Sequence, residues 1–502
     1  MDRVDFIHND SAEFEPSADP GLCPVGAVAG DSFAACYHGP METDGRSPET
    51  ASERPTKGTF LDDTIMLRDP EGSSFVTAVV NLLDLQRQLG RKQQPVEIEN
   101  ERNLVACVLA NGLRCQLYRD PPVVAYQRKA DGKTYIKPNK PTWLSALSLS
   151  RTTELFTDAG LLRLHEADWK TSSGYAVTDK LLSLAEEHGI TDQSLLRCLH
   201  REDLIRLNSP KPKPIYNRIK RTLVRGKADR ISFDPTPETN EMRDRIEAYN
   251  EFLTLQDICV NVPAELEATW VESLNEDETH TGMPLIRPEL FRRAAYRVFN
   301  DGDVKQPRFD LGGRLAGPWW MYAPEKVRSF ITINGEGTCE LDYSACHPRM
   351  LYHELGLEGP NEPYDVPEVA EFEHREGFEP GCYRSGVKWV TQILINGRGR
   401  LDRVDVPKDV ILPTDLPIEE FASMIERFHE PIASSFRTRA GLRLMRMESD
   451  IAVAIIGKAM EKGWVALSVH DSIICPVSHK EELVLLMINE YEERTGMKPI
   501  IH

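Results

Sequence analysis

Two short apolar runs near the C-terminus, separated by a polar tip, constrain the fold of this chain more than any other feature. Val465–Val469 and Ile473–Val477 are strand-like, and His470-Asp471-Ser472 lies between them. Runs of this kind on either side of a short polar segment predict a β-hairpin. The hairpin would present the Asp471 carboxylate at its tip, although polar turn residues without a chemical role give the same pattern.

A second strand-like run also ends in a carboxylate. In Thr338–Gly356, TCELDYSACHPRMLYHELG, we expect a strand that ends at Asp342 and a helix that follows it. A strand fixes the position of such a carboxylate, and the backbone carbonyl of Tyr343 could add a second oxygen ligand for a metal ion. The same residues could instead only cap the N-terminus of the helix.

A third segment, Tyr383–Arg400, predicts an amphipathic helix. Polar residues recur in it at a spacing of four, which places them on one helical face: Arg384, Lys388, Gln392 and Asn396. Two cations on one face could bind a triphosphate. An amphipathic helix at the protein surface has the same pattern.

Charge is distributed unevenly along the chain. The net charge is −19, which on its own argues against a nucleic-acid partner, yet residues 211–230 contain eight Lys and Arg residues and only one acidic residue. Local positive charge favours phosphate contacts because each neutralised phosphate releases counterions. We therefore expect this segment, with Lys220, Arg221 and Arg225 in it, to bind nucleic acid.

The N-terminal half is expected to be mainly helical. Residues 1–60 are rich in Asp, Glu, Ser, Pro and Gly and are predicted to be disordered. In residues 61–205, a helix in Ser148–Leu162 is followed by two strand-like runs at Leu162–Leu164 and Gly174–Thr178. This order resembles a winged helix, whose Ser150–Ala159 helix would enter the major groove. A helical bundle with an ordinary hairpin fits equally well.

Composition narrows the setting of the chain. No apolar run approaches the ~20 residues that a membrane span needs, and no secretory signal is evident at the N-terminus. The ten cysteines contain no C-x-x-C pair, which argues against a zinc site and a disulfide framework. We expect reduced thiols in a cytoplasmic protein that does not bind membranes.

Taken together and in this order, the three segments resemble motifs A, B and C of the family A DNA polymerases and of the related single-subunit phage-type RNA polymerases. Motif A corresponds to Asp342-Tyr343-Ser344 with Arg349, and motif C to His470-Asp471. Motif B corresponds to Arg384 and Lys388, followed by Asn396-Gly397. Two weaker matches are Phe309–Arg314, which resembles a segment that contacts the template–primer hybrid, and the helix opening at Met447–Ile451.

The resemblance implies an α+β fold with a right-hand polymerase palm and fingers in residues 301–502. Residues 206–300 would then be a basic linker followed by a thumb-like helical region. The implied cofactor is a pair of Mg²⁺ ions, for which Mn²⁺ could substitute, bound by Asp342, Asp471 and the carbonyl of Tyr343. The implied partners are a DNA primer–template and nucleoside triphosphates, with RNA as an alternative.

The resemblance also implies individual side-chain roles. Arg384 and Lys388 would bind the phosphates, and Lys388 would also protonate the leaving group. The other residues at the nucleotide would be Gln392, Asn396 and His347. The primer or template would be contacted by His470, Arg314, Arg349, Lys220, Arg221 and Arg225.

Three positions depart from the DNA polymerase pattern. His347 stands where those enzymes usually have a Glu that blocks the ribose 2′-hydroxyl, and Asn396 replaces an aromatic residue near the incoming sugar. Ser472 stands where DNA polymerases usually have a Glu. We expect a template-directed polymerase, with DNA synthesis slightly favoured over RNA synthesis. The alternatives are a catalytically inactive DNA-binding replication or regulatory protein with a degenerate palm, and a metal-dependent nuclease.

Overall fold

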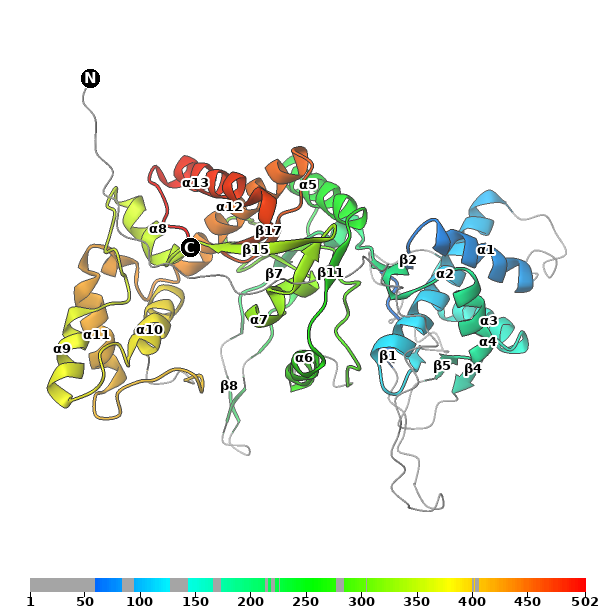
Figure 1. Cartoon of the computed structure of the whole chain (residues 1–502), viewed down its shortest axis with the longest axis horizontal. Coiled ribbons are helices and arrows are strands. Elements are labelled where there is room, and N and C mark those ends of the chain that lie inside the picture. Colours follow the sequence, from blue (N-terminus) through cyan, green and yellow to red (C-terminus); the bar gives the residue numbers. More distant parts are fainter. Residues whose placement is uncertain are drawn as a thin grey trace, which may run out of the picture.

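The computed structural model describes residues 59–83, 94–126, 143–165, 173–212, 215–217, 222–224, 226–276, 284–303, 305–399, 401 and 406–502. Residues 1–60, which we predicted to be disordered, lie almost wholly outside these ranges. Lys220, Arg221 and Arg225, which we predicted to bind nucleic acid, also lie outside them. Within them the fold mixes helices with mainly antiparallel strands (Figure 1), in agreement with an α+β class. None of the described helices is both long and apolar enough to cross a membrane.

Residues 59–197 form an N-terminal lobe with its own hydrophobic core. Helix α2 begins with Pro95, a residue suited to the first helical position, and its inward side packs against α1 and β5. One sheet of the lobe has the strand order β1-β3-β5-β4, and β2 pairs with β6. Its elements are β1 Thr59–Phe60, β2 Ile65–Leu67, α1 Glu71–Leu83, α2 Pro95–Tyr118, β3 Val124–Ala125, α3 Ala146–Asp158, β4 Leu162–His165, β5 Gly174–Val177, α4 Asp179–Glu187 and β6 Leu195–Arg197.

The helix and hairpin expected for a winged helix are present. Ser145 caps α3 by accepting a hydrogen bond from the backbone of Ser148, and β4 and β5 pair antiparallel directly after the helix. The exposed side of α3 carries Arg151 together with the acidic Glu154 and Asp158. This mixed charge gives the helix no net attraction for phosphates, so its insertion into a major groove stays a prediction.

The rest of the chain forms a larger body around two sheets. One sheet has the order β11-β14-β15-β17-β16 and the other β10-β7-β12-β13. Its strands are β7 Ile205–Asn208, β8 Ile215–Asn217, β9 Thr222–Val224, β10 Arg230–Ile231, β11 Ile258–Val260, β12 Tyr296–Phe299, β13 Gly312–Ala316, β14 Ile331–Ile333, β15 Glu336–Asp342, β16 Leu467–Val469 and β17 Ser472–Pro476. Its helices are α5 Pro237–Thr254, α6 Ala264–Glu276, α7 Glu325–Arg328, α8 Cys346–Glu354, α9 Pro367–Glu376, α10 Arg384–Asn396, α11 Ile418–Phe428, α12 Gly441–Glu461 and α13 Lys480–Thr495.

Residues 206–300 share the core of this body instead of forming a unit of their own. Strand β11 pairs with β14, β12 pairs with β7 and β13, and α5 packs against α12. Ile246 and Leu253 of α5 belong to the same buried cluster as Leu341 and Ile474 of the central sheet. The boundary that we expected near residue 300 therefore does not separate two cores.

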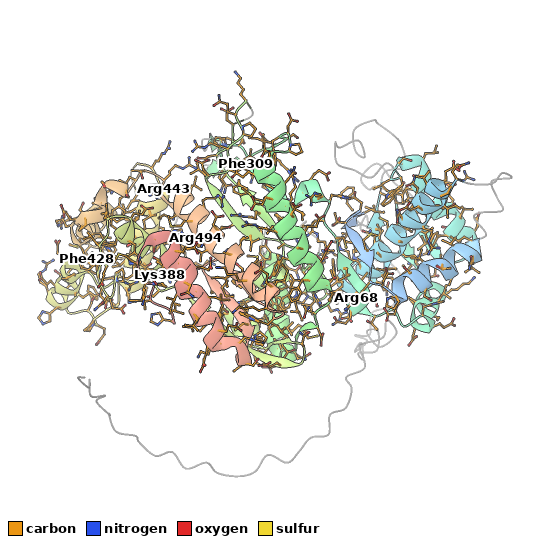
Figure 2. The ribbon with its side chains drawn as sticks, turned by 90° about the horizontal axis from the view of Figure 1, so that it is seen from above. Arg68, Phe309, Lys388, Phe428, Arg443 and Arg494 are labelled. Atoms are coloured by element: carbon orange, nitrogen blue, oxygen red, sulfur yellow. The ribbon has the colours of Figure 1, made fainter. Side chains whose placement is uncertain are left out.

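Helices α9, α10 and α11 lie together at the end of the molecule away from the N-terminal lobe (Figure 1). Viewed from above, Lys388 of α10 and Phe428 of α11 lie at this end, and Arg68 marks the N-terminal lobe (Figure 2). The buried Glu373 of α9 fixes the start of α10, because its carboxylate accepts backbone hydrogen bonds from Gly381 and Tyr383 at 2.8 and 2.9 Å.

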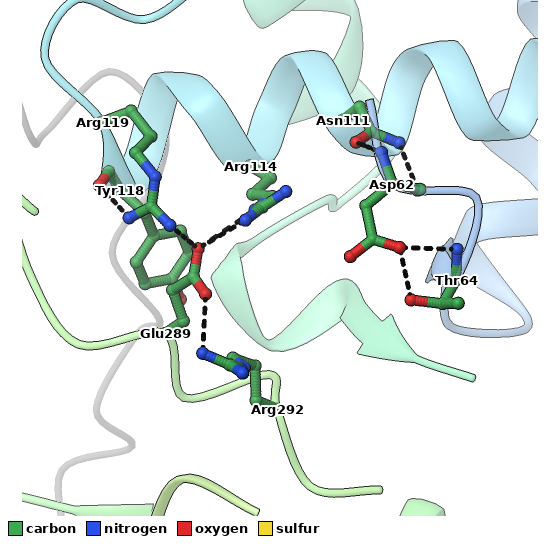
Figure 3. A network of polar contacts seen from close by, with 8 residues as sticks. All are labelled: Asp62, Thr64, Asn111, Arg114, Tyr118, Arg119, Glu289 and Arg292. Atoms are coloured by element: carbon green, nitrogen blue, oxygen red, sulfur yellow. Dashed lines mark hydrogen bonds and ion pairs between the residues drawn. The ribbon is translucent and has the colours of Figure 1, made fainter. Parts of the chain in front are cut away.

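A buried carboxylate joins the N-terminal lobe to the larger body. Glu289 accepts hydrogen bonds from Arg114 of α2 and from Arg119, the residue that follows this helix, at 3.0 and 2.6 Å, and Arg292 lies 3.5 Å away (Figure 3). Burial alone would favour the neutral acid, but the three guanidinium groups outweigh it and hold the pKa of Glu289 at about 2. Phe291 inserts nearby into the core of the N-terminal lobe. The lobes are thus held by a paired buried charge and an apolar anchor.

We expect Glu289→Gln to destabilise the protein by about 3 kcal/mol at pH 7, because it leaves buried arginines without their counter-charge. Thermal unfolding measures the loss, and the exposed Glu272→Gln is the matched control. Since folding lowers the pKa of Glu289, its contribution is present above pH 4.5 and declines as the pH falls toward 2. Equal stability of the variant and the wild type at pH 7 would contradict this account.

Candidate active site

The central sheet brings Asp342 and Asp471 together. Strands β15 and β17 pair antiparallel with Asp342 directly opposite Ser472, and Asp471 lies in the turn between β16 and β17. The backbone N–H of Tyr343 also donates to the carbonyl of Asp471 at 3.4 Å. His470 in this turn has a φ of 58°, a left-handed conformation that His tolerates better than most residues. The predicted hairpin and the predicted strand end are therefore neighbours in one sheet.

A cavity of about 550 Å³ opens beside the two carboxylates. Strands β15 and β17 supply one wall, and α7 with the residues around it supplies the other. Its lining residues are Met321, Glu325, Arg328, Ser329, Thr338, Glu340, Asp342, Val469, His470, Asp471, Ser472 and Ile474. The lining is mostly polar, and the carboxylates are the groups in it best able to attract a cation.

The surroundings of both carboxylates disfavour their charged forms. Burial and the negative charge of the nearby Asp471 raise the pKa of Asp342 to about 6, although the positive charge of Lys388 acts in the opposite direction. Burial and the negative charge of Glu448 raise the pKa of Asp471. Like charges that lie close together raise each other's pKa, and a bound cation relieves the repulsion. The site thus has the electrostatic character of a cation site.

The donor set fits Mg²⁺ held jointly by protein and substrate. The described residues contain no group of three or more His, Cys, Asp or Glu side chains that could hold a metal ion. Two carboxylates and the predicted carbonyl of Tyr343 remain, and Mg²⁺ commonly binds one or two carboxylates together with substrate phosphates and water. These residues alone would therefore leave most coordination positions of a Mg²⁺ ion to other ligands.

A buried ion network lies behind Asp471. Glu448 of α12 is 2% exposed and accepts two hydrogen bonds from Arg314 of β13, one of them at 2.8 Å from Nε. The same carboxylate lies 2.8 Å from Nε2 of His347. Arg314 keeps part of its surface open, and its charge acts on both Asp471 and His470. Glu448 therefore orients a guanidinium beside the carboxylate pair.

The polar face of α10 lies within electrostatic reach of Asp342. Lys388 is exposed, and its positive charge acts on Asp342. Arg384, one turn earlier, forms exposed ion pairs at 3.3 Å with Glu362 and Asp365. Exposed pairs of this kind contribute little stability, so a phosphate group could replace the two carboxylates at low cost.

The remaining two residues of this face make contacts inside the protein. Gln392 hydrogen-bonds the hydroxyl of Tyr364, a buried residue whose ring lies 5.7 Å from the guanidinium of Arg384. Asn396 donates to the backbone carbonyl of Gln392 at 2.8 Å. Asn396 also packs so closely on Gly441 that a Cβ there would lie 1.8 Å from its Oδ1. It therefore fixes α10 against the start of α12.

Three residues that we expected to contact the primer, the nucleotide or the metal have buried side chains. Arg349, 5% exposed, donates to the backbone carbonyls of Ser344, Pro360 and Asn361 and so braces the turn after β15. The buried Tyr343 donates through its hydroxyl to the carbonyl of Met487. His347 is 5% exposed and pairs with Glu448. The structure supports a positioning role for these side chains, because neither Arg349 nor His347 presents much surface to a ligand.

Sequence reasoning missed Glu448, Tyr364 and the pair formed by Arg328 and Glu340. Arg328 binds Glu340 through two hydrogen bonds of 2.8 Å, and Ser472 donates to the same carboxylate at 2.5 Å. Glu340 precedes Asp342 by two residues, and the period of a strand places both side chains on one face. That spacing was a usable signal. Glu448 and Tyr364 gave none, because their partners lie far away in the sequence.

We expect Asp342→Asn to stabilise the protein by about 1 kcal/mol at pH 7.5, because it removes a charge that burial and the nearby Asp471 both disfavour. Folding raises the pKa of Asp342 from 3.8 to about 6, so its ionised form destabilises the folded state increasingly as the pH rises through this window. The difference from the wild type should vanish below pH 4. Thermal unfolding of the wild type and of Asp342→Asn across this pH range tests the prediction, and Asp409→Asn at an exposed position is the control. A loss of stability at pH 7.5 would contradict the electrostatic argument.

Comparison with known proteins adds no assignment to this geometry. No protein-family model matches the chain, and no curated protein matches its sequence. The chemistry of the site must therefore be inferred from its own residues and their arrangement.

Proposed function

We propose that this protein is a template-directed nucleic-acid polymerase that transfers a nucleotide from a nucleoside triphosphate to a 3′-hydroxyl. The observation that carries the proposal is the meeting of Asp342, at the end of β15, with Asp471, in the turn before the paired strand β17. Both line one cavity, and Asp342 lies within electrostatic reach of Lys388. The α+β fold and the polar face of α10 support the same proposal. In it, the central sheet is the palm, and α9, α10 and α11 are the fingers.

The proposed reaction joins a 3′-oxygen to the α-phosphorus of the triphosphate and breaks the bond from that phosphorus to the β-phosphate. The 3′-hydroxyl loses its proton to solvent, and pyrophosphate leaves. Mg²⁺ or Mn²⁺, held by Asp342, Asp471 and the carbonyl of Tyr343, would activate the 3′-hydroxyl and neutralise the phosphates. Lys388 would donate a proton to the departing pyrophosphate, which suits an exposed ammonium next to the carboxylates.

The other residues bind and orient the substrates. Arg384 would exchange its contacts with Glu362 and Asp365 for phosphate oxygens, to which a guanidinium binds more strongly. His470 lines the cavity at the hairpin tip and would contact the primer end. Arg314, held by Glu448, would contact the primer–template. Nothing in these contacts selects the sugar directly, and deoxynucleotides remain the slightly favoured substrates.

We expect the full chain to extend a labelled primer on a template with Mg²⁺, faster with dNTPs than with rNTPs. Asp342→Asn and Asp471→Asn should each abolish extension. Lys388→Gln should lower kcat at least ~100-fold, because general acid catalysis contributes typically that much. Arg384→Gln should mainly raise KM for the nucleotide.

Lys462→Gln provides the control, since Lys462 is exposed directly after α12 and pairs with Glu482, and neither residue lines the cavity. It should extend primers at the wild-type rate. No extension with DNA or RNA primers, templates or either metal, while duplex binding stays intact, would refute the proposal. That result would favour a non-catalytic nucleic-acid-binding protein.

A further inference from the structure

A second basic site lies where the N-terminal lobe meets the larger body, outside the candidate active site. Arg197 ends β6, Arg206 lies on β7, and Arg292 precedes β12. The guanidinium of Arg206 stacks on the ring of Tyr296 at 3.5 Å from its centroid. Tyr322 interacts electrostatically with Tyr296, Arg197 and Arg292. Three arginines and two tyrosines from distant parts of the sequence therefore form one cluster.

The cluster carries more positive charge than the protein neutralises. No carboxylate in the described part of the chain forms an ion pair with Arg197 or Arg206, and Nε of Arg197 is buried without a hydrogen-bond partner. The nearest acids have other partners: Asp62 accepts from Thr64, Asp203 pairs with Arg230, and Glu289 pairs mainly with Arg114 and Arg119.

The arginines also disfavour one another's charge. Burial, and then the charge of Arg292, lowers the pKa of Arg197, and burial together with Arg230 and Arg197 lowers that of Arg206. Arg197 and Arg206 have no carboxylate partner in the described part of the chain, and Arg292 has only Glu289 at 3.5 Å, so this group of guanidinium ions is costly for a folded protein unless an anion binds it. The cluster therefore has the character of an anion site and not of an internal salt bridge.

The cluster continues from the rim of the candidate active site. Met321 lines the cavity beside Asp342 and Asp471, and the next residue, Tyr322, is 53% exposed. Tyr322 lies within electrostatic reach of Tyr296 and Arg197, and Tyr296 in turn stacks with Arg206. A long anionic ligand that leaves the cavity on this side would therefore reach these residues.

We propose that Arg197, Arg206 and Arg292, with Tyr296 and Tyr322, bind the phosphodiester backbone of the nucleic-acid duplex that extends from the cavity. This inference rests on the proposed polymerase function. A guanidinium offers several donors to phosphate oxygens, and tyrosine hydroxyls and rings add sequence-independent contacts. The lobes are held together by Glu289 (Figure 3), so the cluster is assembled before the duplex binds.

Equilibrium binding of a labelled primer–template to the full chain, without metal or nucleotide, tests the proposal. Fluorescence anisotropy at several salt concentrations gives the affinity and its salt dependence. Arg197→Gln with Arg206→Gln should weaken binding at least ~10-fold at low salt. It should also lower the slope of log affinity against log salt by about 1 to 2, because each lost phosphate contact removes about 0.9.

The control is Arg245→Gln with Lys462→Gln, which removes the same charge from exposed ion pairs on α5 and directly after α12. It should leave both affinity and salt slope nearly unchanged. The melting temperature of the Arg197 and Arg206 variant should be equal to or above that of the wild type, because mutual repulsion is removed. Arg197→Lys with Arg206→Lys should restore most of the salt slope, since the charges return.

The binding measurement tests the arginine cluster, and primer extension tests the proposed polymerase function, so the two can fail separately. Weaker binding and a smaller salt slope in the cluster variant support the surface, whether or not the wild type extends primers. Wild-type affinity and slope in the cluster variant, or an equal loss in the control, would overturn it even if the polymerase is active. The inference would also be overturned if the cluster variant bound more weakly and its melting temperature fell as well, because the loss of binding would then reflect a loss of folding.

Discussion

The antiparallel pairing of β15 with β17 is the constraint on which the candidate site depends. Its register runs from Thr338 opposite Pro476 to Asp342 opposite Ser472. A slip by one residue would turn every side chain of a strand to the other face of the sheet. Leu341 opposes such a slip in β15, because it is buried in the main core while Glu340 and Asp342 on either side of it are partly or well exposed. The same apolar packing that stabilises the sheet therefore places Asp342 next to Asp471.

Buried polar groups then fix what surrounds the sheet. Glu448 connects α12 to β13 and α8, and Glu373 fixes the start of α10. The buried His429 joins Tyr352 of α8 to the carbonyl of Pro363. Removal of one partner from contacts of this kind leaves an unpaired buried group and is costly. These buried contacts stabilise the elements around the cavity without help from the cavity residues. The cavity can therefore contain carboxylates that repel one another.

The sequence pattern was sufficient for the local elements of the site. Alternation around His470-Asp471 predicted the hairpin, a strand end predicted the position of Asp342, and four-residue spacing predicted the shared face of Arg384 and Lys388. Each prediction depends on neighbours within one turn or one strand, where periodicity determines direction. The α+β class, which the resemblance implied, agrees with the mixture of helices and mainly antiparallel strands.

The long-range contacts could not be predicted in this way. Burial of His347 and Arg349 depends on Glu448 and on the carbonyls of residues 360 and 361, which no local pattern connects to α8. Residues 206–300 read as a separate region, yet β11 pairs with β14 and β12 pairs with β13, which both come later in the chain. Pairings between distant segments are set by the packed fold, and a single sequence does not reveal them.

The central claim is that Asp342 and Asp471 together hold divalent metal. It is tested most directly by replacing Mg²⁺ with Fe²⁺ in the full chain, adding ascorbate and peroxide, and mapping where hydroxyl radicals cut the backbone. The account predicts cuts near residues 342 and 471 that excess Mg²⁺ suppresses and that Asp342→Asn removes. Cutting elsewhere, or cutting that Asp342→Asn leaves unchanged, would contradict it.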